Sequence, residues 1–236
     1  MKQITILTAL FLGCGLTTFS HADVLGLKAD LSYWNFEGYS ENTTRHPVPE
    51  YQHALDRQGT AQLSVALEHP VPIIPNVKIK YVNLDSQSKE DIPGLSADIQ
   101  LDRIDYILYY EILDNIVSAD LGLGLSNLHG TVQHRNAPYL TDYEADGYAA
   151  LIYGQAGVKL PFTGLSAKAE AVLSRGSDTS LTDLQAEVQY NFIDNLLVDV
   201  GAKAGYRIMK VDAEQSQAPD LKLEFKGPYV GLDIHF

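Results

Sequence analysis

The sequence predicts an all-β protein, a closed antiparallel up-and-down transmembrane β-barrel of about ten strands, from three observations. Apolar and polar residues alternate along most of the 236-residue chain, as they do in strands whose two faces meet different surroundings. The connections between these segments alternate between short turns and long polar stretches, as in membrane barrels. The polar face carries charges of both signs. A cation facing lipid at the bilayer midplane costs about 2–4 kcal/mol, so we place this face inside.

The strand prediction follows the alternation segment by segment. The pattern is weak at 148–160 and short at 165–173, so a barrel of eight strands is the alternative count. The ten predicted strands are residues 25–33, 61–68, 77–81, 104–112, 117–126, 148–160, 165–171, 183–192, 198–208 and 230–236.

Two kinds of connection join these strands, and aromatic residues gather near both strand ends. The short turns are 70–76, 113–115, 161–164 and 193–195, and the polar loops are 37–58, 85–97, 129–146, 176–180 and 212–220. Aromatic girdles are typical of the two membrane interfaces, because these rings have an apolar body and a polar edge. Their predicted members are Tyr110, Phe162, Tyr190, Phe192 and Phe236 by the turns, and Tyr33, Trp34, Tyr81, Tyr148, Tyr206 and Tyr229 toward the loops. An even strand number leaves both chain ends on the turn side.

The N-terminus has the pattern of a cleaved export signal. Lys2 precedes an apolar run at 4–16, and Ser20 and Ala22 supply small residues at the −3 and −1 positions of a cleavage site. The run is too short for a spanning helix, which needs about 20 residues. We therefore predict a signal peptide at 1–22 and one barrel domain at 23–236. The single cysteine, Cys14, lies inside the signal, and a lipoprotein would need it at the cleavage point.

Composition excludes several classes of protein. The formal net charge is −13, which disfavours a nucleic-acid partner, because binding to phosphates requires a basic face. Mean hydropathy is −0.09, which disfavours a bundle of transmembrane helices. Without cysteine, the mature chain has no disulfide or thiolate site, and we expect no cofactor and no metal.

Charges on the polar face are the candidate lining of the lumen. Ten strands lie near the size at which side chains fill a barrel, while Gly122, Gly124, Gly201 and Gly205 leave room for a narrow water path. The predicted lining residues are Lys28, Asp30, Glu111, Asp120, Lys168, Glu170, Glu187, Asp199, Lys203 and Arg207.

The last strand ends on an aromatic residue after alternating apolar ones, at Val230, Leu232, Ile234 and Phe236. This ending resembles the C-terminal assembly signal of bacterial outer-membrane β-barrel proteins. The segments 109–115 (YYEILDN) and 120–124 (DLGLG) also resemble the small, largely uncharacterised members of that class. The resemblance covers the mature chain. It implies a Gram-negative outer-membrane location, outer-membrane lipid as surroundings, and barrel-assembly machinery and periplasmic chaperones as partners; we expect a monomer.

Histidines in the predicted loops are the only candidates for chemistry. His46 and His53 lie near Glu41, Glu50 and Asp56, but a solvated loop is the favoured interpretation over a metal site. An enzyme at the outer rim would need a fixed acid–base pair. Its candidates are His129 and His134 with Asp142, Glu144 and Asp146, or Ser126 with His129; His235 and Asp233 are expected in the interior ion-pair network.

These observations favour a non-enzymatic outer-membrane barrel with acidic external loops. Its role would be structural, or surface interaction, or a narrow porin-like pore for small solutes. The alternative is a barrel protease or lipid-modifying hydrolase with a site at the external rim. A soluble lipocalin-like barrel in the periplasm is a third interpretation.

Overall fold

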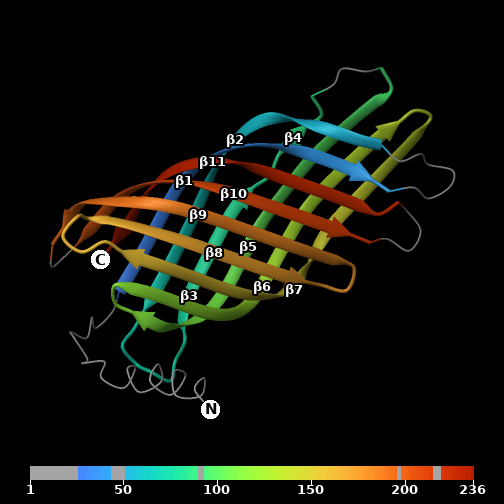
Figure 1. The fold of residues 1–236 in the computed structure, drawn as a ribbon. Helices are drawn as coiled ribbons and strands as arrows, with labels where there is room; N and C mark the ends of the chain where they lie inside the picture. Colours follow the sequence, from blue (N-terminus) through green and yellow to red (C-terminus); the bar gives the residue numbers. More distant parts are fainter. Residues whose placement is uncertain (1–25, 44–50, 90–92, 196–197, 215–218) are drawn as a thin grey trace, which may run out of the picture.

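Ten long antiparallel strands wind around a common axis in the computed structural model (Figure 1). The structure describes residues 26–43, 51–89, 93–195, 198–214 and 219–236, so the predicted signal peptide and His46 lie outside the described residues. The strands are β1 (Gly26–Asn42), β2 (Tyr51–Glu68), β3 (Asn76–Asn83), the two-residue β4 (Ser86–Gln87), β5 (Leu95–Asp114), β6 (Val117–Asn136), β7 (Tyr139–Lys159), β8 (Leu165–Arg175), β9 (Thr179–Asp194), β10 (Asp199–Ala213) and β11 (Leu221–His235).

The sheet closes on itself. The strand order is β3-β2-β1-β11-β10-β9-β8-β7-β6-β5, and β3 also pairs with β5. Closure gives each strand a neighbour on both sides, which a membrane requires of backbone groups in lipid. The prediction of a closed up-and-down barrel with ten strands is therefore confirmed. No helix in the described ranges is both long and apolar enough to span a bilayer.

Short turns and the C-terminus lie together at one end of the barrel. β1 meets the chain end there, where Leu27 and Phe236 exchange two backbone hydrogen bonds of 3.1 and 2.9 Å. At the other end, two predicted loops are wrong in large part and a third is too long. Most of 129–146 is strand, because β6 runs to Asn136 and β7 starts at Tyr139, and much of 37–58 is strand in β1 and β2. The loop predicted at 85–97 is shortened by β4 and the start of β5.

Near the short turns, the outer surface of the barrel is apolar. Each strand contributes exposed large side chains at alternate positions, which form what we call the apolar band. Its members include Leu31 on β1, Leu63 and Val65 on β2, Val77 and Ile79 on β3, Tyr106 and Leu108 on β5, Leu121 and Leu123 on β6, Ile152 on β7, Leu173 on β8, Leu184 and Val188 on β9, Tyr206 on β10, and Val230 and Leu232 on β11. An apolar exterior around a polar interior suits a barrel in lipid.

Beyond the apolar band, the polarity of the two faces reverses. On β5 the outward residues become Asp102, Gln100 and Asp98, and the inward residues Leu101 and Ile99 are 2% and 1% exposed. The same change occurs on β10 and β11. The long-loop half of the barrel is thus polar outside and apolar inside, like a water-soluble protein. This reversal explains the wrong loops: the alternation continues, but its polar phase faces outward.

The predicted aromatic girdles are correct for most residues and wrong for two. Tyr33, Tyr148 and Tyr206 are exposed on the outer face toward the long loops. Trp34 and Tyr229 point into the barrel instead and are 0% and 3% exposed. Each is directly adjacent in sequence to a residue on the outer face, Tyr33 and Val230 respectively. Because neighbouring residues of a strand point to opposite faces, alternation alone assigns Trp34 and Tyr229 to the interior.

Candidate functional site

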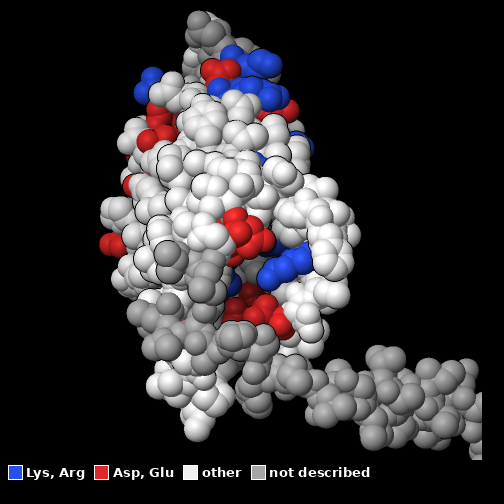
Figure 2. Space-filling model, turned by 90° about the vertical axis from the view of Figure 1, so that its left-hand side faces the viewer, with Lys and Arg blue, Asp and Glu red and all other residues white. Residues whose placement is uncertain are grey.

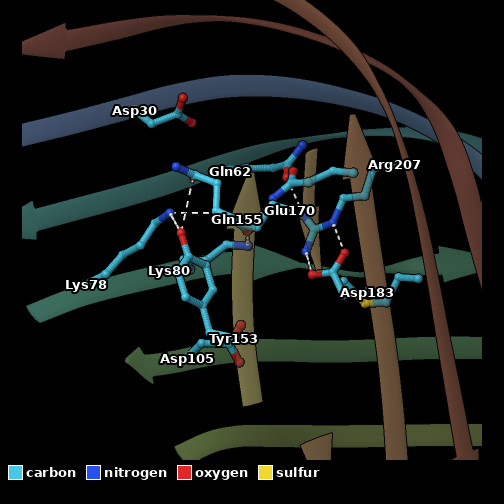
Figure 3. Close-up of polar contacts among 12 residues, drawn as sticks. Asp30, Gln62, Lys78, Lys80, Asp105, Tyr153, Gln155, Glu170, Asp183 and Arg207 are labelled. Atoms are coloured by element: carbon cyan, nitrogen blue, oxygen red, sulfur yellow. Dashed lines mark hydrogen bonds and ion pairs between the residues drawn. The ribbon is translucent and has the colours of Figure 1, made fainter. Parts of the chain in front are cut away.

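Two buried arginines share one carboxylate in the middle of the barrel. Arg207 on β10 donates from Nε and Nη2 to the two oxygens of Asp183 on β9, both at 2.8 Å (Figure 3). Arg103, from β5 on the opposite wall, donates from Nη1 to Asp183 Oδ2 at 2.7 Å. All three side chains are 1–2% exposed. A charge buried this deeply is stable only with partners, and here each has them.

Further polar groups complete this central network. Asp105 accepts from Arg103 Nε at 2.9 Å and from the Ser126 hydroxyl at 2.6 Å. Gln62 on β2 accepts from Arg207. The network therefore connects β2, β5, β6, β9 and β10 across the lumen, and we call it the central bridge.

Two more ion-pair groups lie on the short-turn side of the central bridge. Lys78 and Lys80 on β3 both contact Glu170 on β8, the first at 2.8 Å. Lys203 on β10 contacts Asp30 and lies 3.0 Å from Glu187.

Tyr229 adds a hydrogen bond of 2.8 Å to Glu187, and its ring covers Gly205. A Cβ at Gly205 would lie 2.6 Å from Tyr229 Cζ, so the space left by this glycine is filled.

Further pairs of opposite charge lie at the mouth of the barrel at the short-turn end, with separations from 2.6 to 3.9 Å. Lys28 lies 2.6 Å from Glu68 and 3.6 Å from Glu111. Lys168 lies 3.8 Å from Asp233, and His235 Nε2 lies 3.9 Å from Glu68 Oε2. His235 and Asp233 thus lie beside the interior charged groups at this mouth, as the sequence indicated.

A cavity of about 660 Å³ lies between these groups and opens at the short-turn end. Figure 2 looks onto this end and shows basic and acidic side chains around the hollow. All ten residues predicted to line the lumen line this cavity. The prediction missed Glu68 and Arg103, which also line the cavity, and the buried Asp183. Arg103 lies in phase with Glu111 on β5, and Asp183 lies in phase with Glu187 on β9, whereas β2 carried no predicted lining residue.

Toward the long loops, a hydrophobic cluster fills the interior. Trp34 and Phe36 have ring centroids 4.7 Å apart, and Phe36 meets Phe225 edge-on at 5.5 Å. Arg207 of the central bridge lies 4.8 Å from the Trp34 ring centre. We call this cluster the cap. Its members are Trp34, Phe36, Leu55, Val82, Leu84, Ile99, Leu101, Val132, Tyr143, Leu181, Met209, Val211, Leu221, Leu223, Phe225 and Tyr229.

Of the candidate catalytic pairs, only His129 and Asp146 come together, on the outer face. Ser126 points inward to Asp105, whereas His129 points outward, with a 66% exposed side chain 3.5 Å from Asp146. His134 lies on the inner face, apart from Asp142 and Glu144 on the outer face. Odd and even positions of one strand face opposite sides, so continuing the alternation of β6 past residue 128 would have separated these residues.

His134 instead belongs to a buried polar layer beside the cap. Its Nε2 lies 2.6 Å from the Ser40 hydroxyl, and its ring centre lies 5.1 Å from that of His53. His53 Nε2 lies 3.1 Å from Asn136 Oδ1. Ser40 and His134 are 0% and 1% exposed, so this pair offers no surface to a substrate. No cluster with the composition of a metal site occurs among the described residues.

The predicted assembly signal lies at the end of β11. Val230, Leu232 and Phe236 are 59%, 45% and 59% exposed on the outer face. Its role in assembly stays a prediction.

No protein-family model and no curated protein sequence matches the chain. Among solved structures, it is similar to the translocator domain of the autotransporter NalP from Neisseria meningitidis, with 12% identity over 98% of this chain and 94% of that chain and a TM-score of 0.43. It is also similar to the outer membrane protease OmpT from Escherichia coli, with 10% identity over 93% of this chain and 99% of that chain and a TM-score of 0.46. The outer membrane protein OprG from Pseudomonas aeruginosa gives 10% identity, 92% and 98% coverage, and a TM-score of 0.38. These similarities concern the β-barrel fold and carry no information about role.

The central bridge generates the first prediction. Asp183→Asn removes the negative charge that Arg103 and Arg207 share, and breaking a buried pair in this way costs about 3–5 kcal/mol. The matched control is Glu37→Gln, which breaks the exposed 2.6 Å pair with Arg57 and should cost at most about 1 kcal/mol. The free energy of unfolding in urea, measured in lipid vesicles, distinguishes the two. Equal losses would contradict the central bridge.

The buried His134 leads to a second prediction, which concerns the pH dependence of stability. His134 lies beyond the apolar band, and burial, followed by the nearby His53, lowers its pKa from 6.5 to about 4. Between these pH values the unfolded segment binds a proton that the folded one does not, so stability falls as pH falls. Hydrogen exchange of the β6–β7 hairpin should accelerate, beyond the intrinsic pH effect, on going from neutral pH to about pH 4.5.

Two histidine substitutions test the assignment. His134→Gln should weaken this pH dependence, whereas His129→Gln, on the exposed outer face, should leave it in place. A pH dependence that is unchanged in His134→Gln would show that another group causes it.

Proposed function

We propose that the protein is a monomeric outer-membrane barrel that conducts no solutes and serves for interaction at the cell surface. The observation that carries this proposal is the cap, which fills the interior between the cavity and the long-loop end. The cavity opens toward the short turns, which are the periplasmic end in barrels of this architecture.

Membrane location is supported by the two surfaces of the short-turn half. The apolar band faces outward around a charged interior, an arrangement that is costly in water and favourable in lipid. Barrels of this kind belong to the Gram-negative outer membrane, and the predicted signal peptide at 1–22 would export the chain. Outer-membrane lipid, the barrel-assembly machinery and periplasmic chaperones are the expected partners.

Absence of conduction is supported by the packing of the lumen. The central bridge places side chains from opposite walls in direct contact, and the cap then replaces charged groups with apolar ones. Ions passing the cap would have to lose their hydration, which is costly in an apolar interior. The narrow-pore interpretation is therefore less favoured.

Surface interaction is supported by the half of the barrel beyond the apolar band. Its outer face carries exposed charged residues that would stand outside the lipid. A rim hydrolase, the alternative function, would need an exposed acid–base pair. His129 and Asp146 supply such a pair, 3.5 Å apart on the outer face, but the candidate nucleophile Ser126 and the second histidine, His134, face the interior.

Conductance in a planar bilayer tests the proposal. Inserted unmodified protein should give no discrete steps. Phe36→Ala combined with Phe225→Ala removes two packed rings from the cap and should produce steps, because the remaining side chains cannot fill the space completely.

The matched control is Tyr190→Ala combined with Phe192→Ala, which removes two rings from the outer face. This variant should stay silent. Discrete, reproducible steps from the unmodified barrel would contradict the proposal.

A further inference from the structure

The β6–β7 hairpin extends well past its neighbour β8. β7 pairs with β6 along its whole length, from Tyr139 to Val158, but it pairs with β8 only from Ala150 to Lys159. Residues 139–149 therefore form an edge strand beyond the end of β8 (Figure 1). None of the described strands pairs with this edge.

The backbone N–H and C=O groups that point toward this unpaired edge belong to the even-numbered residues of β7. Lys159 donates its backbone N–H to Ile116 beside β6, whereas Leu160 donates to Leu165 on the β8 side. The β6–β7 register is continuous, so the backbone direction alternates regularly along β7. The N–H and C=O groups of residues 140, 142, 144, 146 and 148 consequently point toward the unpaired edge. Such an edge is a template for another strand.

The edge lies outside the apolar band, where backbone groups can be hydrated. On β6 the outward residues change from Leu125 to Asn127 at the border of the band, and on β7 they change from Tyr148 to Asp146. In lipid, unpaired groups of this kind would each cost several kcal/mol. Their position makes them available to a partner from the aqueous side.

Charge selects the kind of partner. Three outward residues of the edge strand, Asp142, Glu144 and Asp146, are exposed and form an acidic column between the exposed Leu140 and Tyr148. A strand added to this edge would place its alternate side chains directly beside that column. A second copy pairing antiparallel through the same edge would oppose acid to acid, which is destabilising. Lysine or arginine at every second position would be favourable.

We propose that the β7 edge at residues 139–149 binds an extended polypeptide segment with basic residues at alternate positions, by addition of a strand to the sheet. Backbone hydrogen bonds provide the affinity, and the acidic column provides the selection. This inference deepens the proposed surface-interaction role and rests on it.

A peptide of alternating lysine and valine is the probe, and the receptor is the full barrel in lipid nanodiscs. We expect saturable binding, measured by fluorescence anisotropy, and slowed hydrogen exchange of even-numbered amides at 140–148. Two matched peptides act as controls. One replaces lysine with glutamate, and the other is N-methylated at the bonding amides; both should lose binding.

Comparison of Glu144→Lys with Asp98→Lys distinguishes peptide binding at the β7 edge from non-specific electrostatic attraction to the acidic outer face. Both reverse an acidic residue on the outer face, but Asp98 lies on β5, two strands away from the edge. Glu144→Lys should weaken peptide binding about tenfold, and Asp98→Lys should change it much less.

Three results would overturn the inference: no binding, equal binding of the N-methylated peptide, or equal effects of the two substitutions. These failures are distinct from failure of the proposed function. A silent barrel that ignores the peptide refutes only the edge site, whereas a conducting barrel refutes the sealed lumen.

Discussion

The central bridge is the interaction on which the rest of this structure depends. Arg103 and Arg207 come from opposite walls, and Asp183 joins them. Burying any one of these charges alone would cost several kcal/mol, so the three must meet, and their meeting fixes the distance between β5 and β9–β10. The bridge also marks a boundary. Charged groups and the cavity lie on its short-turn side, and the cap begins on the other, where Arg207 faces the ring of Trp34.

The reversal of polarity along single strands follows the surroundings of each half. Where lipid lies outside, apolar side chains face outward and charges pair within. Where water lies outside, the same strands bury apolar side chains, and these close the lumen as a hydrophobic core. The hydrophobic effect favours this burial in the half of the barrel that lies beyond the apolar band. One continuous barrel combines a membrane protein with a small soluble domain built from the same strands.

Alternation in the sequence was sufficient to predict the strand number, the closed architecture and the ten cavity-lining residues. It failed where its phase reversed. The segment 129–146 appeared to be a loop because its outward residues are polar, although Val132 and Tyr143 still mark an apolar inner face. The separation of Ser126 from His129 was within reach of the same rule. Partners such as Arg103 and Asp183, 80 residues apart, were not, because the register and shear of a closed barrel decide which walls face each other.

Accessibility of cysteines along the outer face of β6 is the most direct test of this account. The only cysteine, Cys14, lies in the predicted signal peptide, so single cysteines can be introduced at Leu121, Leu123, Asn127, His129 and Thr131. In lipid vesicles, a membrane-impermeant maleimide should label His129→Cys and Thr131→Cys and leave Leu121→Cys and Leu123→Cys unlabelled. The change should fall near Asn127. Lipid protection that continues through Thr131, or labelling of Leu121→Cys as fast as Thr131→Cys, would contradict a barrel whose polarity reverses at the membrane surface.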